Sequence, residues 1–266
     1  TANWIGKSFV SKVRLVFSRF DSENEFLNYV MERFVPVADD RIVVSNYLKN
    51  KFGGTKVVHG VDINFFNPIN FDKQEVRSKL ELNHEDIYIL FSGMPREHKG
   101  IEDLLTAIIN IGQKNLKLLI VGGDVNHKYY KKLLSIGQDF IVAVGPRSHD
   151  EMPSYLAASD IVVLPQRNTT FAMAQVPAKV FEAMAMGKPI ISTNVSDLSE
   201  ILAGCGIVID PIKDTTELEN QIKLLINDTS VSKSLGVCAR RKCIAEYSWE
   251  RMGEKLCPIF DKHLQK

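Results

Sequence analysis

Six short apolar runs constrain the fold of this chain more than any other feature of its sequence. Most of them are continuous stretches of Ile, Val and Leu, as in parallel strands that are covered on both faces. Amphipathic stretches of helical period separate the runs. The alternation predicts an α/β fold with a doubly wound, Rossmann-like parallel sheet, which binds ligands at the carboxyl ends of its strands. The runs occupy residues 87–93, 116–123, 140–145, 160–165, 189–193 and 206–210.

The first 70 residues follow a different pattern. The spacing of Ser22 and Glu25 predicts a capping box for an early helix. A single strand–helix pair then follows, with RIVVS (41–45) as the strand and NYLKNKF (46–52) as the helix. One strand and one helix are too few for a separate sheet. We therefore expect residues 1–70 to be the end of another Rossmann-like domain.

These patterns divide the chain into three expected parts. Residues 1–70 form the remnant of an amino-terminal domain and end in an extended, turn-rich connector at 57–68. Residues 71–247 hold the predicted sheet and its helices, and 248–266 form a closing helix with a large apolar face. We expect that helix to be interrupted near Pro258, because proline lacks the backbone N–H that a helix needs.

The composition excludes several classes of protein. Lys and Arg number 33 against 32 Asp and Glu, so the chain lacks the basic field of a nucleic-acid binder. Its four cysteines are scattered, with no C-x-x-C, which indicates reduced thiols and a cytoplasmic protein. No run reaches the length of a membrane-spanning helix, and no signal peptide is recognisable. The chain starts at Thr1, and we expect it to be a processed or excised piece.

A basic loop follows the first apolar run, within FSGMPREHKGIEDLL (91–105). The strand ends at Gly93, and a helix begins after the loop. Arg96, His98 and Lys99 place positive charge beside the amino end of that helix, which favours anions through its free N–H groups and dipole. The loop suits a phosphate or diphosphate, and a solvated basic turn is the alternative interpretation. The Walker sequence is not present.

A second strand–loop–helix junction lies in VGPRSHDEMPSYL (144–156). Ser148 or Asp150 is expected to cap the helix, since both residue types are favoured at that position. A second interpretation is that the loop lines the crevice of the sheet, with backbone groups that face a planar base. We expect His149 to lie at the surface and not to be catalytic.

The third candidate is the segment 165–189, where a long polar loop leads to a helix that starts at Pro177. Glu182 is the one carboxylate in the almost wholly apolar stretch FEAMAMGKPI, and a buried Glu is costly unless it is paired. Lys179 lies three residues earlier and shares its helix face. Two interpretations remain: Glu182 is a surface helix residue, or it accepts hydrogen bonds from ribose hydroxyls at the carboxyl edge of the sheet.

In this order, the three stretches resemble the carboxyl-terminal, donor-binding domain of retaining GT-B glycosyltransferases, the "glycosyl transferases group 1" family. The resemblance runs from VSNYLKNKF and HGVDINFFNP to the end of the chain. The connector resembles the interdomain hinge of that family, and the closing helix resembles the segment that crosses back to the amino-terminal domain. The most specific segments are GMPREHKG, VGPRSHDEMPSYLAASDIVVLP and PAKVFEAMAMGKPIISTNVSDLSEIL.

The resemblance implies catalytic roles for Arg96 and Lys99, which would hold the diphosphate and stabilise its departure. Lys99 matches the family lysine of the phosphate loop, whereas Met94 stands where the family has an arginine, for which Arg96 substitutes. The ribose-binding glutamate of the family falls on Glu182. Its partner, which meets the transferred sugar, falls on Ala174.

The resemblance also implies the remaining donor contacts. The base-stacking loop falls on residues 145–147, and the loop 174–178 would present backbone groups to the sugar. No metal and no cofactor is implied, because the nucleotide-diphosphate sugar is a substrate and cationic groups carry the charge of the leaving group. The donor-binding residues implied are Gly93, Gly145, Arg147, Gln175, Val176, Lys179 and Glu182.

The resemblance therefore implies a retaining, hexosyltransferase-type glycosyltransferase, of which this chain supplies the donor-binding half and is inactive alone. The sugar and base of the donor stay open. So does the acceptor, which is a glycan, a lipid or a small molecule, with peripheral membrane contact through the absent half. One alternative is a non-catalytic sugar-nucleotide-binding subunit or scaffold, which Ala174 favours. A second is a sugar-nucleotide epimerase of the same fold, which the pattern PAKVFEAMA disfavours.

Overall fold

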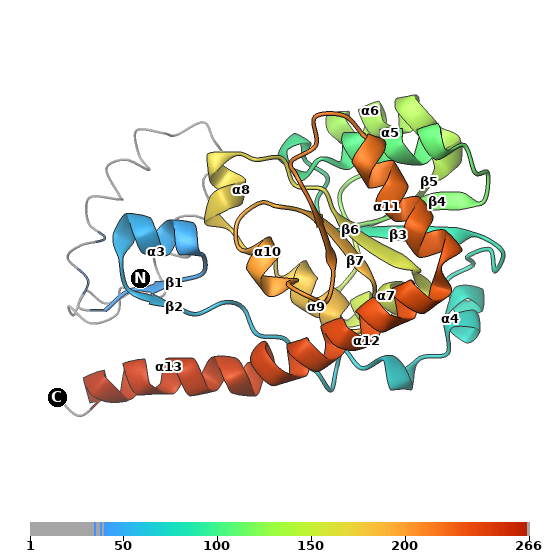
Figure 1. Cartoon of the computed structure of the whole chain (residues 1–266). Coiled ribbons are helices and arrows are strands. Elements are labelled where there is room, and N and C mark those ends of the chain that lie inside the picture. Colours follow the sequence, from blue (N-terminus) through green and yellow to red (C-terminus); the bar gives the residue numbers. More distant parts are fainter. Residues whose placement is uncertain (1–34, 36–37, 39, 265–266) are drawn as a thin grey trace.

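The structure is a computed structural model that describes residues 35, 38 and 40–264. Its centre is a six-stranded parallel sheet in the order β5-β4-β3-β6-β7-β8 (Figure 1). All six strands predicted from the apolar runs are present, which confirms the doubly wound α/β fold. They are β3 (Ile87–Ser92), β4 (Leu116–Val121), β5 (Ile141–Gly145), β6 (Ile161–Leu164), β7 (Ile190–Thr193) and β8 (Ile207–Ile209).

Helices cover both faces of this sheet (Figure 1). On one face lie α5 (Ile101–Ile111), α6 (Lys128–Gly137) and α11 (Thr216–Asn227). On the other lie α4 (Lys73–Lys79), α7 (Met152–Ala158), α9 (Lys179–Ala185) and α12 (Thr229–Glu246). The shorter helical segments are η2 (Pro68–Asn70), η3 (Glu97–Lys99), η4 (Gln138–Phe140), η5 (His149–Glu151), α8 (Thr170–Ala174) and α10 (Leu198–Ile201).

Burial on both faces explains why the strands are continuously apolar. In β3, Tyr88 and Leu90 belong to the hydrophobic cluster under α7 and α9, whereas Ile89 and Phe91 belong to the cluster under α5 and α6. None of the four is more than 4% exposed. Burying such a side chain contributes about 1.5–3 kcal/mol, so apolar side chains are favoured on both faces of the strand.

The central strand β3 pairs with β4 on one side and with β6 on the other. The chain therefore runs outward first to β5 and then, from β6, to β8 at the opposite edge. In open α/β sheets a crevice forms where the direction of winding reverses, beyond the carboxyl ends of the strands. The loops that follow β3, β5 and β6 meet at this edge.

The amino-terminal part of the described chain is a small unit beside the main sheet (Figure 1). The predicted strand and helix are present as β1 (Ile42–Val43) and α3 (Asn46–Phe52). A second strand, β2 (Thr55–Lys56), pairs with β1 in parallel and was not predicted, since two residues show no periodicity. The capping box of Ser22 and Glu25 lies outside the described residues.

The closing helix α13 (Trp249–Leu264) extends from the main sheet beneath the small amino-terminal unit (Figure 1). It is continuous through Pro258, so the predicted interruption is wrong. Pro258 removes only the bond to the carbonyl of Glu254, and both residues are exposed, which leaves that carbonyl to solvent. Two backbone bonds tie the helix start to the connector, from Val61 N–H to the Tyr247 carbonyl (3.0 Å) and from Trp249 N–H to the Val61 carbonyl (3.1 Å). Across the described residues, no helix combines the length and apolarity needed to cross a bilayer.

Candidate functional site

The loop after β3 brings cationic side chains to the amino end of α5. Lys99 is partly buried; its Nζ donates to the carbonyl of Met94 at 2.8 Å and lies 5.8 Å from the centre of the Phe91 ring. Burial is the main cause of a pKa of Lys99 lowered to about 8, and the positive charges of Arg96 and Lys179 contribute to the same lowering. The structure thus brings together three of the predicted site residues, from the β3 loop and from α9.

Gly93 and Gly100 give this loop its shape. Gly93 has φ +117°, and a Cβ there would lie 3.5 Å from Lys99 Nζ. Gly100, which precedes α5, has φ +66°, and a Cβ there would lie 1.9 Å from the carbonyl oxygen of Pro165 at the end of β6. Only glycine adopts such a conformation freely and also permits so close an approach of two backbones.

The loop after β6 is fastened to the loop after β3. The backbone N–H of Arg167 donates to the carbonyl of His98 at 2.9 Å. The guanidinium of Arg167 makes two bonds of 2.9 Å to the carboxylate of Asp103, in the first turn of α5. The rings of His98 and Phe171 also meet edge to face at 5.0 Å. These contacts fix the two loops relative to each other.

Glu182 lies on α9, the helix that follows the loop after β6. It is 6% exposed, so the interpretation as a surface residue is wrong. Lys179 Nζ lies 3.1 Å from both carboxylate oxygens, as the spacing of three residues predicted. A carboxylate has about four lone-pair positions, so this pairing satisfies the buried charge and leaves acceptor capacity for a ligand.

The loop after β5 approaches Glu182 from the other side. Gly145 has φ +77° with open space where a Cβ would point. Ser148 caps the following helix in a capping box with Glu151, so of the two predicted caps Ser148 is the one used. Arg147 Nε donates to the hydroxyl of Tyr155 at 2.9 Å, which turns its side chain toward α7. The exposed His149 is at the surface, as expected.

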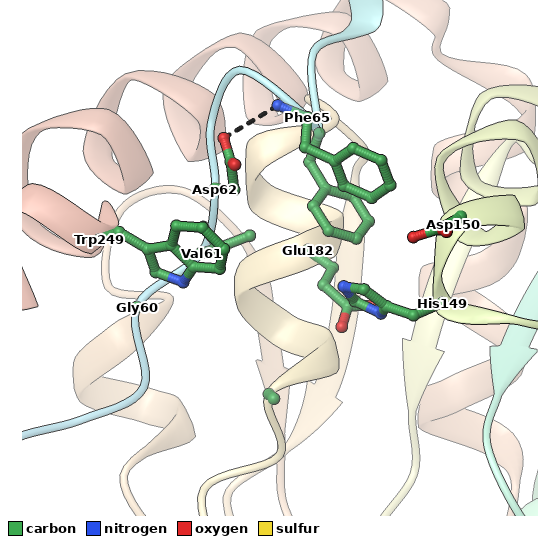
Figure 2. Close-up of a pocket in the computed structure, with 10 residues that line it drawn as sticks. Gly60, Val61, Asp62, Phe65, His149, Asp150, Glu182 and Trp249 are labelled. Atoms are coloured by element: carbon green, nitrogen blue, oxygen red, sulfur yellow. Dashed lines mark hydrogen bonds between the residues drawn. The ribbon is translucent and has the colours of Figure 1, made fainter.

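A pocket of ≈ 250 Å³ lies between the connector, η5 and the start of α9. Glu182 and His149 both line it, and Figure 2 shows them below the ring of Phe65. His149 stacks on Phe65 at 5.8 Å and meets Phe66 at 5.4 Å. Sequence reasoning missed the aromatic and acidic lining, for which the pair Phe65-Phe66 in a turn-rich connector was the available signal. The lining residues are Gly60, Val61, Asp62, Phe65, Phe66, His149, Asp150, Ala178, Glu182 and Trp249.

The predicted sugar-facing loop lies between α8 and α9. Ala174 ends α8, Gln175 is partly buried and Val176 is 3% exposed. The hydroxyl of Ser45, on the small amino-terminal unit, donates to the carbonyl of Ala174 at 3.2 Å. Over the part of the chain that the structure describes, no group of three or more His, Cys, Asp and Glu residues is arranged to hold a metal ion.

Comparison with known proteins identifies the family. The profile described as "Glycosyl transferases group 1" matches residues 86–228, which is more than half of the 266-residue chain. The chain belongs to this family. The match covers the loops after β3, β5 and β6 and the helix α9 that carries Glu182, whereas the connector and Trp249, which also line the pocket, lie outside it.

Curated relatives of this group 1 glycosyltransferase chain match most of its length. An uncharacterized glycosyltransferase of Methanocaldococcus jannaschii is 30% identical over 80% of this chain and 57% of the relative. A GDP-mannose-dependent monoacylated alpha-(1-6)-phosphatidylinositol monomannoside mannosyltransferase of Corynebacterium glutamicum is 27% identical over 75% of this chain and 54% of the relative. The chain thus spans little more than half the length of these two relatives.

Solved structures show the same fold. Sucrose-phosphate synthase from Thermosynechococcus elongatus matches with a TM-score of 0.78 and 22% identity, over 94% of this chain and 66% of that one. Anabaena HepE, solved in complex with UDP-glucose, matches with a TM-score of 0.76 and 19% identity, over 92% of this chain and 69% of that one. These neighbours place the group 1 chain in the GT-B fold.

Proposed function

We propose that this chain is the donor-binding half of a retaining glycosyltransferase that moves a sugar from a nucleotide-diphosphate sugar to an acceptor. One observation carries the proposal: the positive charges of Arg96, Lys99 and Lys179 lie close together near the amino end of α5. Glu182, which pairs with Lys179, lies at the same carboxyl edge of the sheet. Phosphates and a ribose are the parts of such a donor that these groups recognise. The UDP-glucose complex of the structural neighbour HepE is consistent with this class of ligand.

In this proposal the diphosphate binds at the loop after β3. Lys99 and Arg96 face it with positive charge, and the free N–H groups at the start of α5 add a favourable dipole. As the bond between sugar and diphosphate breaks, negative charge grows on the leaving group, and fixed cations in a partly buried site stabilise that charge more in the transition state than before it. The mechanism assigned in this way uses side-chain cations and not a metal ion.

The ribose is assigned to Glu182, whose remaining acceptor positions suit the two ribose hydroxyls. The base is assigned to the loop 145–147, with the aromatic pocket beside it. The loop 174–178 presents its backbone to the sugar. Retention of configuration follows from the family resemblance, in which the acceptor attacks on the same face that the diphosphate leaves. Since the acceptor site is not assigned to this half, we expect the chain alone to bind donor without transferring sugar.

The first test is the substitution Lys99→Ala. Losing a hydrogen bond to a charged group typically costs about 1.5–3 kcal/mol, so affinity for nucleoside diphosphates is expected to fall by roughly a factor of ten or more. Isothermal titration with UDP, GDP and ADP measures this and also identifies the base. The control Lys132→Ala removes an exposed lysine that pairs with Glu102 and is expected to leave affinity unchanged. Equal binding by Lys99→Ala and the unmodified chain would contradict the assignment.

The depressed pKa of Lys99, about 8, predicts a pH dependence of binding. Below pH 8 the ammonium is already charged and binding is insensitive to pH; above pH 8 the neutral amine must take up a proton before it can pair with the diphosphate. Affinity is therefore expected to fall by up to about tenfold per pH unit above 8, in a range where phosphate ionisation is complete. Titrations at pH 7, 8 and 9 measure the fall.

The matched control for this pH dependence is Lys99→Arg. A guanidinium stays protonated throughout this range, so its affinity is expected to remain flat from pH 7 to 9. A decline of the same size in Lys99→Arg would assign the pH dependence to another group.

A second candidate function is a non-catalytic sugar-nucleotide-binding subunit, and one observation favours it. Ala174 cannot contact the transferred sugar in the way that the family glutamate does at this position. Both candidates bind donor, so binding alone does not separate them. Transfer measured on the longest natural chain that contains these residues does: product formation supports the enzyme, and tight donor binding with no product over many hours supports the subunit.

A further inference from the structure

The small amino-terminal unit holds the sugar-facing loop through one buried hydroxyl. Ser45 precedes α3 and is fully buried. Its hydroxyl accepts from the Leu48 N–H at 3.3 Å, which caps α3, and donates to the Ala174 carbonyl at 3.2 Å. The two residues are separated by 129 positions in sequence. One side chain therefore both starts α3 and reaches across to the loop between α8 and α9.

A buried carboxylate holds the start of α3 in place. Asp197, 5% exposed, accepts from the Asn46 N–H at 3.1 and 3.0 Å and from Lys56 Nζ at 3.1 Å. The preceding Ser196 has φ +56°, a conformation that costs a non-glycine residue energy. Asp197 thus binds both strand β2 and the first turn of α3, which follows Ser45 in sequence.

The bond to Ala174 controls the direction of the next residue. The peptide between Ala174 and Gln175 is held at both ends, because its carbonyl accepts from Ser45 and its N–H donates to the Ala172 carbonyl at 3.2 Å. Without the Ser45 hydroxyl, the carbonyl end of this peptide loses its partner and the peptide plane can turn. The Gln175 side chain and the backbone that leads to α9 would turn with it.

We propose that Ser45 is a positioning residue for the donor sugar. By holding the Ala174–Gln175 peptide, it fixes the conformation of the loop 174–178, which contacts the sugar part of the donor and not the nucleotide part. This inference rests on the proposed function. It also means that the sugar is recognised in full only when α3 is docked, so that the amino-terminal side of the protein takes part in the choice of donor.

The test compares each nucleotide sugar with its own nucleoside diphosphate, using isothermal titration of UDP-glucose, GDP-mannose and ADP-glucose. For the pair that the unmodified chain binds most tightly, Ser45→Ala is expected to weaken the nucleotide sugar about fivefold, the typical effect of one neutral hydrogen bond. Affinity for the diphosphate is expected to change by less than about twofold. The lost cap also lowers stability, which would weaken binding of both ligands. The readout is therefore the affinity for the nucleotide sugar divided by the affinity for its nucleoside diphosphate.

Three variants complete the design. Ser45→Thr keeps the hydroxyl and is expected to restore the ratio. Asn46→Ala removes an exposed bond to Glu200 (2.8 Å) at the same end of α3 and is expected to leave the ratio unchanged. Asp197→Asn weakens the docking of α3 without altering Ser45, so it is also expected to lower the affinity for the nucleotide sugar relative to that for its nucleoside diphosphate. It replaces Ser45→Ala in the test if the Ser45→Ala chain does not fold.

The outcomes separate this inference from the function on which it rests. An unmodified chain that binds no nucleoside diphosphate overturns the proposed function and the inference with it. A chain that binds the diphosphates, and whose ratio is the same in Ser45→Ala and Asp197→Asn as in the unmodified protein, overturns the inference alone.

Discussion

Gly100→Ala is expected to lower the free energy of unfolding by about 3–5 kcal/mol, a large share of the roughly 5–15 kcal/mol that is typical of folded proteins. Two effects add at this position. A residue with a Cβ is strained at φ +66°, which costs about 1–2 kcal/mol. The new Cβ would also lie 1.9 Å from the Pro165 carbonyl oxygen, a backbone atom that moves only if β6 or α5 moves. Urea unfolding followed by circular dichroism measures the loss.

Gly204→Ala is the matched control. Gly204 has a similar φ of +73°, but no atom lies within 4 Å of the added Cβ. Only the strain remains there, so a loss of about 1–2 kcal/mol is expected. If the two variants lose the same stability, the contact between Gly100 and Pro165 is not what makes glycine necessary.

This close approach matters for the site as well as for stability. Gly100 lies directly after Lys99, and Pro165 begins the loop that carries Arg167 and leads to α9. Glycine at position 100 lets the backbones of the two loops touch. This contact holds the cations of the β3 loop close to Lys179 on α9.

The sheet could be predicted from sequence because its strands are buried on both faces. Runs such as 87–93 have no polar alternation, and a parallel sheet between two helical layers is the arrangement that hides them. The closing helix could be predicted by its apolar period, but its continuity could not. Whether Pro258 ends a helix depends on solvent access to the Glu254 carbonyl, a tertiary property that a local sequence rule does not contain.

The candidate site was predictable in its local parts only. The spacing of Lys179 and Glu182 on one helix is enough to predict their ion pair, and the basic loop next to a helix start is visible in sequence. Two hydrogen bonds of the site join positions more than a hundred residues apart, from Ser45 to Ala174 and from the Asn46 N–H to Asp197. No sequence periodicity indicates such long-range bonds. The burial of Lys99 in a basic loop is not visible in the sequence either, so its lowered pKa appears only in the structure.

The second large effect is expected for Glu182→Ala, which should abolish the preference of the chain for a ribonucleotide over its 2′,3′-dideoxy analogue. If the carboxylate accepts bonds from the ribose hydroxyls, its loss weakens binding of the ribonucleotide by roughly tenfold or more, the typical effect of a hydrogen bond to a charged group. The dideoxy analogue never makes these bonds and should lose little. Titration of UDP, GDP or ADP with the matching analogue gives both values.

The ion pair with Lys179 makes the comparison between the two ligands necessary. Removing Glu182 leaves Lys179 without the partner that it contacts at 3.1 Å, and an unpaired ammonium near the diphosphate strengthens binding of any nucleotide. That gain is common to both ligands and cancels in their ratio, whereas the ribose contact does not cancel.

Lys179→Ala provides the complementary control, because it breaks the same ion pair and keeps the carboxylate. It should weaken both ligands by a similar factor and preserve the preference for the ribonucleotide. If instead Glu182→Ala changes the two affinities equally, the carboxylate serves only to pair with Lys179, and its place in an apolar helix would be a matter of local charge balance and not of ribose recognition.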